Sequence, residues 1–581
     1  MYAIAKYFLP AACFLLIAVF FMLLPDLRVC TLEGGSRRFR RADALLMSAV
    51  TLIYAVVAFT GLGNTESPQS FVNLEGQTAV IKPDLSDGTV SKLMLFTGVG
   101  IGSYSIDYTT DGSDSYHLAD FEQSHAEVLK WHPVSLNYEI TGGTIFIRGS
   151  GNVWLGEVVP LTEDGRVVRA GSDRPELTDE QSLCPDRQSF MNSSYFDEIY
   201  HARTAWEHLN GVYPYEITHP PLGKIIIGLG IRLFGMTPFG WRFSGTLFGV
   251  LMLPILYYFA KKLFGGYLVP TSCAVLMATD FMHFVQTRIA TIDTYAVFFI
   301  LLMYLFMYLF ITEDRLWALA LCGISFGLGA AAKWTCFYAG AGLAVIWLLW
   351  AIHGFRAGTL NLKGFVKNAL FCVVFFVLVP CGIYYLSYYP YGVAEGKTDI
   401  FSRDYLNMVL SNQQYMFNYH SQLIATHPYS SDWYQWLLDI RPILYYLDYL
   451  PDGRHVSFGA FVNPVLCWGG LFALFVLGFL AVARRDLPSA YILLGYLAQL
   501  LPWVLVQRLI FAYHYFPCTV FLALALGRCF DVMLRNDRHG WIYVCGFAAL
   551  SCAVFVLFYP NLAGLPVASG ILRSWLPTWP F

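Results

Sequence analysis

The sequence predicts a polytopic α-helical membrane protein with an inserted β domain. Of its 581 residues, 56% are hydrophobic and 17% aromatic, whereas only 13% are charged. Soluble proteins carry about 25% charged residues, and a soluble chain of this length could not bury so much apolar surface. The apolar residues gather in long runs, and one long polar stretch with strand-like alternation separates the second run from the third.

About 20 apolar residues in a helix span the hydrocarbon core of a bilayer. By this criterion we expect about twelve spans. Pro25 and Asp26 follow the first run without a small-residue cleavage site, so we expect a membrane helix there and not a signal peptide. The expected spans lie near 8–24, 44–61, 241–260, 267–283, 293–311, 316–333, 338–352, 366–388, 458–482, 488–506, 510–530 and 541–559.

Basic residues predict the sidedness of these spans. Every second connection is rich in Arg or Lys, and such loops remain in the cytoplasm. We therefore expect both termini outside, together with the long stretches 62–240 and 389–457. The basic residues concerned are Arg28, Arg37, Arg38, Arg40, Arg41, Lys261, Lys262, Arg315, Arg356, Lys363, Lys367, Arg484, Arg485, Arg535 and Arg538.

The charge balance and the cysteines exclude some classes of function. A net charge of −3 with scattered basic residues gives no indication of nucleic-acid binding. Most of the 13 cysteines lie in apolar runs, where they behave as small hydrophobic residues, and the polar stretch 64–195 contains only Cys184. We expect neither a disulfide framework nor a zinc site.

The chain divides into seven segments. Residues 70–168 are the predicted outer β domain, because short alternating segments such as Lys92–Phe96 and Thr144–Arg148 are separated by turn-forming pairs, for example Gly142-Gly143. The other segments are the first two spans (1–63), a polar linker (169–194), an outer loop with membrane-surface helices (195–240), a group of spans (241–388), a second outer loop (389–457) and the C-terminal spans (458–581).

Two adjacent carboxylates, Asp197 and Glu198, begin an amphipathic stretch that is too short to span a bilayer. A helix over about 197–209 would lie along the membrane surface, with both acids at its favourable N-terminus. His219 and the two prolines after it then fix an extended turn, and Lys224 begins the next apolar run. Taken alone, the acids could equally well be helix caps and Lys224 a snorkelling anchor.

Cations also occur at the predicted outer ends of spans, namely Arg288, Lys333, Arg508 and His514. A cation inside lipid costs about 2.5–3.5 kcal/mol on insertion scales, so each is a functional candidate, with snorkelling as the structural alternative. Asp293 follows Arg288 by five positions and could be its ion-pair partner.

This series of motifs resembles the protein O-mannosyltransferases of the GT-C superfamily, which use dolichyl- or polyprenyl-phosphate-mannose. The match covers roughly 44–60 and 190–530. Eukaryotic members carry a β-trefoil domain in a later loop, which 389–457 is too short to hold, so the chain is more similar to bacterial members. The matching segments are Phe196–Glu198, His219–Lys224, Phe239–Phe243, Thr287–Asp293, Lys333-Trp334, His427–Trp433, Arg441–Ile443, Leu501–Trp503, Arg508 and Tyr513–Tyr515.

The resemblance implies a GT-C fold and an inverting transfer of mannose, or a related hexose, from a polyprenyl-phosphate carrier to a Ser or Thr hydroxyl of a protein. The reaction would take place on the outer side of the cell membrane. The implied residues are Asp197 as catalytic base with Glu198 beside it, Arg288, Lys333, Arg508 and His514 for the donor phosphate and lipid carrier, and His219, Lys224 and Arg441 for substrate positioning.

The implied reaction requires no cofactor. A divalent metal held by the acid pair with a histidine is the other physical option, as in some related aminoarabinose transferases, but no His cluster indicates it. Two alternatives remain open: a lipid-carrier transferase that modifies an envelope glycan or lipid, and a transporter of a lipid-linked sugar. Transporters tend to show internal repeats and charges near the membrane midplane, whereas the ionisable residues here gather at the outer edge.

The β insert resembles jelly-roll sandwiches of the discoidin or carbohydrate-binding kind. Tyr104, Ile106 and Tyr108 would place three large side chains on its core face. The insert could be a structural lid, or it could bind a glycan or acceptor through exposed loop residues. The successive strands would include Lys92–Phe96, Gly102–Tyr108 and Val153–Val158, and the exposed loop residues would include Asp111, Trp131 and His132.

Overall fold

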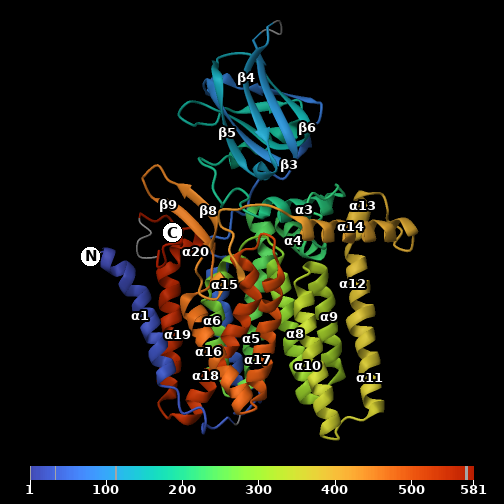
Figure 1. Cartoon of the computed structure of the whole chain (residues 1–581). Helices are drawn as coiled ribbons and strands as arrows, with labels where there is room; N and C mark the ends of the chain where they lie inside the picture. Colours follow the sequence, from blue (N-terminus) through green and yellow to red (C-terminus); the bar gives the residue numbers. More distant parts are fainter. Residues whose placement is uncertain (1, 33–34, 111–113, 569–573, 581) are drawn as a thin grey trace. The chain divides into compact units, whose positions relative to one another are not determined.

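The structure is a computed structural model that describes residues 2–32, 35–110, 114–568 and 574–580 (Figure 1). The chain forms two compact units. The helical unit contains Met1–Thr60, Glu216–Ile225 and Gly245–Phe581, and the β-containing unit contains Gly61–Tyr215 and Ile226–Ser244.

Within the described residues, nine helical stretches are long and apolar enough to span a membrane. A tenth is present if α6 (Leu268–Ala278) and α7 (Phe281–Thr287), which are bent by 57° at their junction, form one span. The nine are α2 (Arg41–Phe59), α5 (Pro238–Phe264), α8 (Asp293–Glu313), α10 (Cys336–Arg356), Leu362–Ala394 with α11 (Leu362–Val373), α12 (Val379–Ser387) and α13 (Tyr389–Ala394), α16 (Pro464–Ala483), Leu487–Leu505 with α17 (Leu487–Leu500), Ala512–Asn536 with α18 (Phe516–Asn536), and α19 (Gly540–Phe558).

Two shorter apolar stretches complete the set: Tyr7–Met22 in α1 (Tyr2–Met22) and α9 (Leu316–Ala332). Each segment that the sequence predicts as a span contains helix, which confirms the multi-span membrane protein, while the number twelve stays a prediction. Burial divides the helices by position: 89% of the apolar window in Ala512–Asn536 is buried, against 6% in Leu362–Ala394. The former is therefore the centre of the bundle, and α11 and α12 are its lipid-facing edge.

The polar connections of the helical unit form their own elements. α14 (Arg403–Gln422) lies across the direction of α12 and belongs to the second predicted outer loop, followed by α15 (Trp433–Trp436) and a hairpin of β8 (Ile443–Tyr449) and β9 (His455–Ala460) (Figure 1). α14 buries one stripe at helical spacing, Tyr405, Met408, Val409, Asn412 and Met416.

The predicted β domain is confirmed as one antiparallel sheet of seven strands. Its order is β4-β3-β6-β2-β7, with β5 beside β3 and β1 beside β6. The strands are β1 (Val72–Asn73), β2 (Thr78–Pro83), β3 (Val90–Thr109), β4 (Tyr116–Gln123), β5 (Trp131–Ile140), β6 (Thr144–Leu161) and β7 (Ala170–Ser172).

Two details of the β prediction are wrong. Lys92–Phe96 and Gly102–Tyr108 are not successive strands but the two ends of β3, because the register shifts at Phe96/Thr97 and Thr97/Gly100 bend one long strand and interrupt its alternation. Trp131 and His132 are not exposed loop residues: they lie in β5 and are 1% and 7% exposed.

The core of the domain follows the predicted alternation. Tyr104 and Ile106 are fully buried in one hydrophobic cluster, and Tyr108 packs against it, as the period of two predicts. Asp111 lies outside the described residues. The assignment of the sheet to the jelly-roll, discoidin-like class stays a prediction.

Candidate functional site

The helix predicted over about 197–209 is present as α3 (Glu198–Asn210), with Asp197 at the N-cap position, while its place on the membrane surface stays a prediction. The side chain of Asp197 accepts no capping hydrogen bond, so this carboxylate does not have the structural role of a helix cap. Phe196, directly before it, adopts a φ of 46°, a left-handed conformation that is uncommon for a bulky residue. Such strained positions cluster at functional sites.

Glu198 is held by Arg242, the arginine of the Phe-Gly-Trp-Arg-Phe motif at Phe239–Phe243. Arg242 Nε and Nη2 donate to Glu198 Oε1 and Oε2 at 2.7 and 2.8 Å. The remaining N–H groups of the guanidinium donate to the carbonyls of Leu62, Phe190 and Ser193 at 2.7–3.1 Å. All five donors are therefore used, and both side chains are at most 1% exposed. Glu198 anchors the start of α3 in this way.

The His-Pro-Pro turn in the helical unit is closed by a second buried ion pair. Lys224, 1% exposed, pairs with Glu216 and donates to the carbonyls of Glu216 and His219 at 3.0 and 2.8 Å. The same Glu216 contacts His219 Nδ1 through Oε1 at 3.0 Å. Lys224 is thus part of a closed turn and not a snorkelling anchor. The turn also requires glycine, since a Cβ on Gly223 would lie 2.6 Å from Ile292 Cγ2.

A cavity of about 370 Å³ gathers three of the predicted residues, His219, Lys333 and Arg508. We call it the His219 cavity. Lys333 Nζ pairs with Asp293 Oδ1 at 2.6 Å, so the expected pairing of Asp293 with Arg288 is wrong. The other lining residues are Trp334, Thr335, Tyr338, His420, Ser421, Trp503, Leu505, Val506 and Gln507.

Arg508 gives the cavity its electrostatic character. Lys333 is neutralised by Asp293, whereas Arg508 has no ion-pair partner among the residues that the structure describes. A half-buried guanidinium without a carboxylate favours an anionic ligand, and its planar fork matches phosphate oxygens. The exposed side chain of Leu505, 83% accessible, lines the same cavity. Charge and apolar surface therefore meet in one place.

His420 is a cavity residue that the sequence reasoning did not single out. Its Nε2 lies 2.8 Å from the carbonyl oxygen of Thr218, and because a carbonyl only accepts, Nε2 carries the proton. Asn412, eight residues earlier in α14, donates to the carbonyl of Ile217 at 3.1 Å. Two side chains of α14 thus hold two successive carbonyls of the turn that carries His219. The amphipathic pattern of residues 403–422 is the sequence feature that could have indicated His420.

Both cavity histidines are neutral at pH 7. Burial lowers the pKa of His420 to about 4, helped by the positive charge of Arg508. Burial also lowers the pKa of His219, and this outweighs the opposing effect of Glu216. The cavity therefore offers a cation for an anionic group and neutral rings beside it.

Three predicted residues lie apart from the lining of this cavity. Arg288 donates to the carbonyls of Ala58 and Thr60 at 2.9 and 2.8 Å, and Arg441 donates to the carbonyl of Pro428. The ring of His514 lies 4.4 Å from that of Trp503, which does line the cavity. Roles for the three in binding stay predictions.

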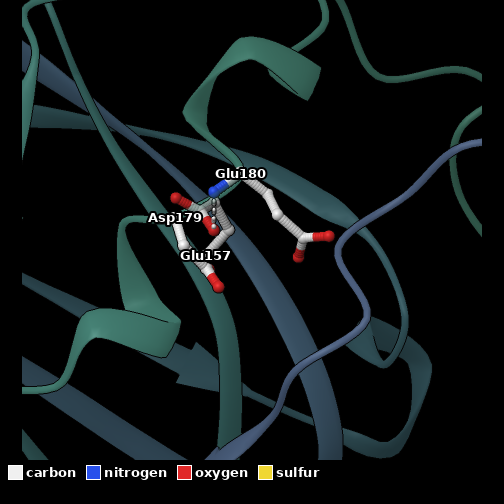
Figure 2. Close-up of side chains that lie close together, drawn as sticks. All are labelled: Glu157, Asp179 and Glu180. Carbon is white, nitrogen blue, oxygen red and sulfur yellow. Dashed lines mark hydrogen bonds between the residues drawn. The ribbon is translucent and has the colours of Figure 1, made fainter.

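Potential metal ligands gather in one place among the described residues, at Glu157, Asp179 and Glu180 of the β-containing unit. One carboxylate oxygen of each of these residues lies within 4.8 Å of the other two, and the backbone N–H of Glu180 donates to Glu157 Oε2 at 3.2 Å (Figure 2). Burial and the two neighbouring carboxylates raise the pKa of Glu157 to about 8. At neutral pH this carboxyl holds a proton, which makes it a poor cation ligand.

Two family models match the chain. The model described as dolichyl-phosphate-mannose-protein mannosyltransferase matches residues 218–384, and that described as the C-terminal four TMM region of protein-O-mannosyltransferase matches residues 405–579. Together they cover well over half of the 581 residues. Both leave out the β domain.

Curated relatives and a solved structure are also similar to this chain. A polyprenol-phosphate-mannose–protein mannosyltransferase of Mycolicibacterium smegmatis is 26% identical over 452 residues, 66% of this chain and 87% of the relative. That of Mycobacterium tuberculosis is 25% identical, covering 66% and 86%. The Saccharomyces cerevisiae protein O-mannosyltransferase Pmt1-Pmt2 complex bound to the sugar donor has a similar fold, with a TM-score of 0.59 at 15% identity, covering 67% and 89%. This chain belongs to the protein O-mannosyltransferase family.

Proposed function

We propose that the protein transfers mannose from a polyprenyl-phosphate carrier to a Ser or Thr hydroxyl of a protein on the outer side of the plasma membrane. The observation that carries the proposal is the His219 cavity, where Arg508, which has no ion-pair partner among the described residues, lies beside the exposed apolar side chain of Leu505. A lipid-linked phosphate needs both kinds of surface. The names of the curated relatives support mannose as the sugar and protein as the acceptor.

In this proposal Arg508 and Lys333 hold the phosphate that becomes the leaving group. The acceptor oxygen forms a bond to the anomeric carbon as the bond from that carbon to the phosphate oxygen breaks. The carrier leaves as polyprenyl phosphate, and the hydroxyl proton passes to Asp197. Attack opposite the leaving group inverts the anomeric configuration.

Asp197 would act mainly through its position, because an ordinary aspartate has a pKa of about 3.9 and is a weak base for an alcohol. Its position is fixed by the next residue, Glu198, which Arg242 holds through two hydrogen bonds. Preorganised placement of a base is worth about 10²–10⁴ in rate.

The test is transfer by the purified protein in lipid. With polyprenyl-phosphate-mannose and a Ser/Thr-rich peptide, we expect mannosylated peptide and released polyprenyl phosphate. Arg508→Gln should raise KM for the donor about tenfold, the size expected for a lost charge-assisted contact, with little change in KM for the peptide. The matched control is Arg454→Gln, which removes an exposed arginine from the β8–β9 hairpin.

Two results would contradict the proposal. Transfer to an envelope glycan or lipid but not to peptide would identify the alternative acceptor class. An equal donor KM for wild type, Arg508→Gln and Arg454→Gln would place the carrier phosphate elsewhere.

A further inference from the structure

A second cavity, of about 520 Å³, lies at the other end of α9. Leu316 at the start of α9 lines it, whereas Lys333, directly after the end of α9, lines the His219 cavity. The 17 residues of α9 separate the two by about 25 Å. We call it the Lys367 cavity. It lies between the ends of α8, α9, α10 and α11, and nothing in the proposed reaction uses it.

Lys367 and Asp314 line this cavity with opposite charges, and neither has an ion-pair partner among the described residues. A third group, the side-chain oxygen of Asn368, is buried without a hydrogen-bond partner in the part of the chain that the structure describes, although Nδ2 of the same side chain donates to the carbonyl of Gly364 at 3.0 Å. The exposed Lys367 can therefore accept an anionic group, while the exposed Asp314 and the buried oxygen of Asn368 can accept hydrogen bonds from a donor.

The position of these groups at the end of a membrane-spanning stretch indicates a lipid headgroup. Lys367 and Asn368 lie in the first turns of Leu362–Ala394, whose most apolar window has a mean hydropathy of 2.4 and is 6% buried. Lys367 is the sixth residue of α11, about 7 Å along the helix from its first residue. The face of α11 away from Asn368 exposes Leu362, Val366 and Leu370, at 70%, 45% and 62%, as a lipid-facing helix does. Polar groups beside such a face at the end of a span lie at the level of the lipid headgroups.

We propose that the Lys367 cavity binds the headgroup of a phospholipid that carries a primary amine. The phosphate lies against Lys367, and the ammonium donates hydrogen bonds to the Asp314 carboxylate and the Asn368 amide oxygen. Trp350, which lines the cavity near the end of α10, packs at the level of the glycerol and first acyl carbons, where tryptophan is enriched in membrane proteins. Because Lys367 and Asp314 carry opposite charges, the cavity fits a zwitterionic headgroup better than an anionic one.

Phosphatidylcholine provides the discriminating comparison, because it has the same net charge and the same phosphate but no N–H to donate. The experiment is native mass spectrometry of the full-length protein in detergent, with phosphatidylethanolamine, phosphatidylcholine or phosphatidylglycerol of identical acyl chains. We expect one tightly retained phosphatidylethanolamine, at about tenfold higher occupancy than phosphatidylcholine, as one or two charge-assisted hydrogen bonds predict.

Variants locate the site. Asp314→Asn should bring phosphatidylethanolamine down to the phosphatidylcholine level, and Lys367→Gln should lower the retention of both lipids, whereas Lys363→Gln should behave as wild type. Lys363 is the matched control, an exposed lysine one turn earlier on α11 that does not line the cavity.

Four outcomes would overturn the proposal. They are equal retention of phosphatidylethanolamine and phosphatidylcholine by wild type, stronger retention of phosphatidylglycerol, displacement of the lipid by inorganic phosphate, and an equal loss in Lys363→Gln. The wild-type comparison needs no substitution, so it holds even if a variant folds poorly.

Discussion

The Glu198–Arg242 pair and the His219 cavity each contain an arginine, but the two arginines differ in burial and in pairing. Arg242 is 1% exposed, and every N–H of its guanidinium is bonded within the β-containing unit. Arg508, in the helical unit, is only half-buried and has no ion-pair partner among the described residues. Burial of the guanidinium and its pairing with a carboxylate, and not the residue type, therefore distinguish a structural arginine from a ligand-binding one.

The largest expected effect concerns Asp197, the carboxylate next to Glu198 in the sequence. Asp197→Asn keeps the size of the side chain and removes the base, so transfer should fall about 10²–10⁴-fold while donor binding is unchanged. Product formation per enzyme at saturating donor measures this. Activity within threefold of wild type would remove Asp197 as the base.

The next largest effect concerns the Glu198–Arg242 pair, whose loss should lower the stability of the folded protein. Arg242→Ala leaves the Glu198 carboxylate buried without a cation, which costs about 3–5 kcal/mol for a buried pair. We expect a large drop in the thermal unfolding midpoint of the full-length protein. Arg508→Ala is the control and should leave the midpoint nearly unchanged. Equal midpoints for the two variants would break the distinction between the two arginines.

A smaller effect should come from the support of the cavity. His420→Phe loses the hydrogen bond to Thr218 and leaves its carbonyl unsatisfied, at a cost of about 1–3 kcal/mol, whereas His420→Gln keeps an N–H for it. We expect KM for the donor to rise about tenfold in the former and to return close to wild type in the latter. If Phe and Gln lower transfer equally, the ring itself matters and not its bond.

The smallest effect compares two buried glutamates. Glu157 is as buried as Glu198 but pairs with no arginine within the described ranges, and burial raises its pKa to about 8. An unfolded glutamate has a pKa of about 4.3, so the folded domain holds a proton that the unfolded chain releases. Stability from this group is full below about pH 4 and is lost as the pH rises towards 8.

Glu157→Gln should therefore raise the thermal midpoint by a few degrees at pH 8 and reduce its decline between pH 6 and 8. Glu163→Gln, on an exposed glutamate of the same domain, is the control and should change neither. A parallel decline in wild type and Glu157→Gln would show that Glu157 is ionised in the folded protein.

The sequence alone determined the membrane class, the β domain, the helix after Asp197 and the family, because hydropathy, alternation and collinear motifs are local properties of the chain. It also indicated Lys333 and Arg508 as candidates for binding the donor phosphate, and both line the His219 cavity. It could not assign partners: Asp293 pairs with Lys333 and not Arg288, and Glu198 is held from Arg242, 44 positions away.

Which charged side chains are neutralised by a partner, and which face a cavity, depends on the tertiary structure. The sequence predicts Trp131 and His132 in exposed loops, but they pair with Phe96 and Leu95 of β3, and Trp131 is buried in a cluster with side chains of β3 and β6. His420 and Asp314 carry no motif, and they became visible only where helices that are distant in sequence enclose a space. Burial and ion pairing are properties of that enclosure, and local sequence does not encode it.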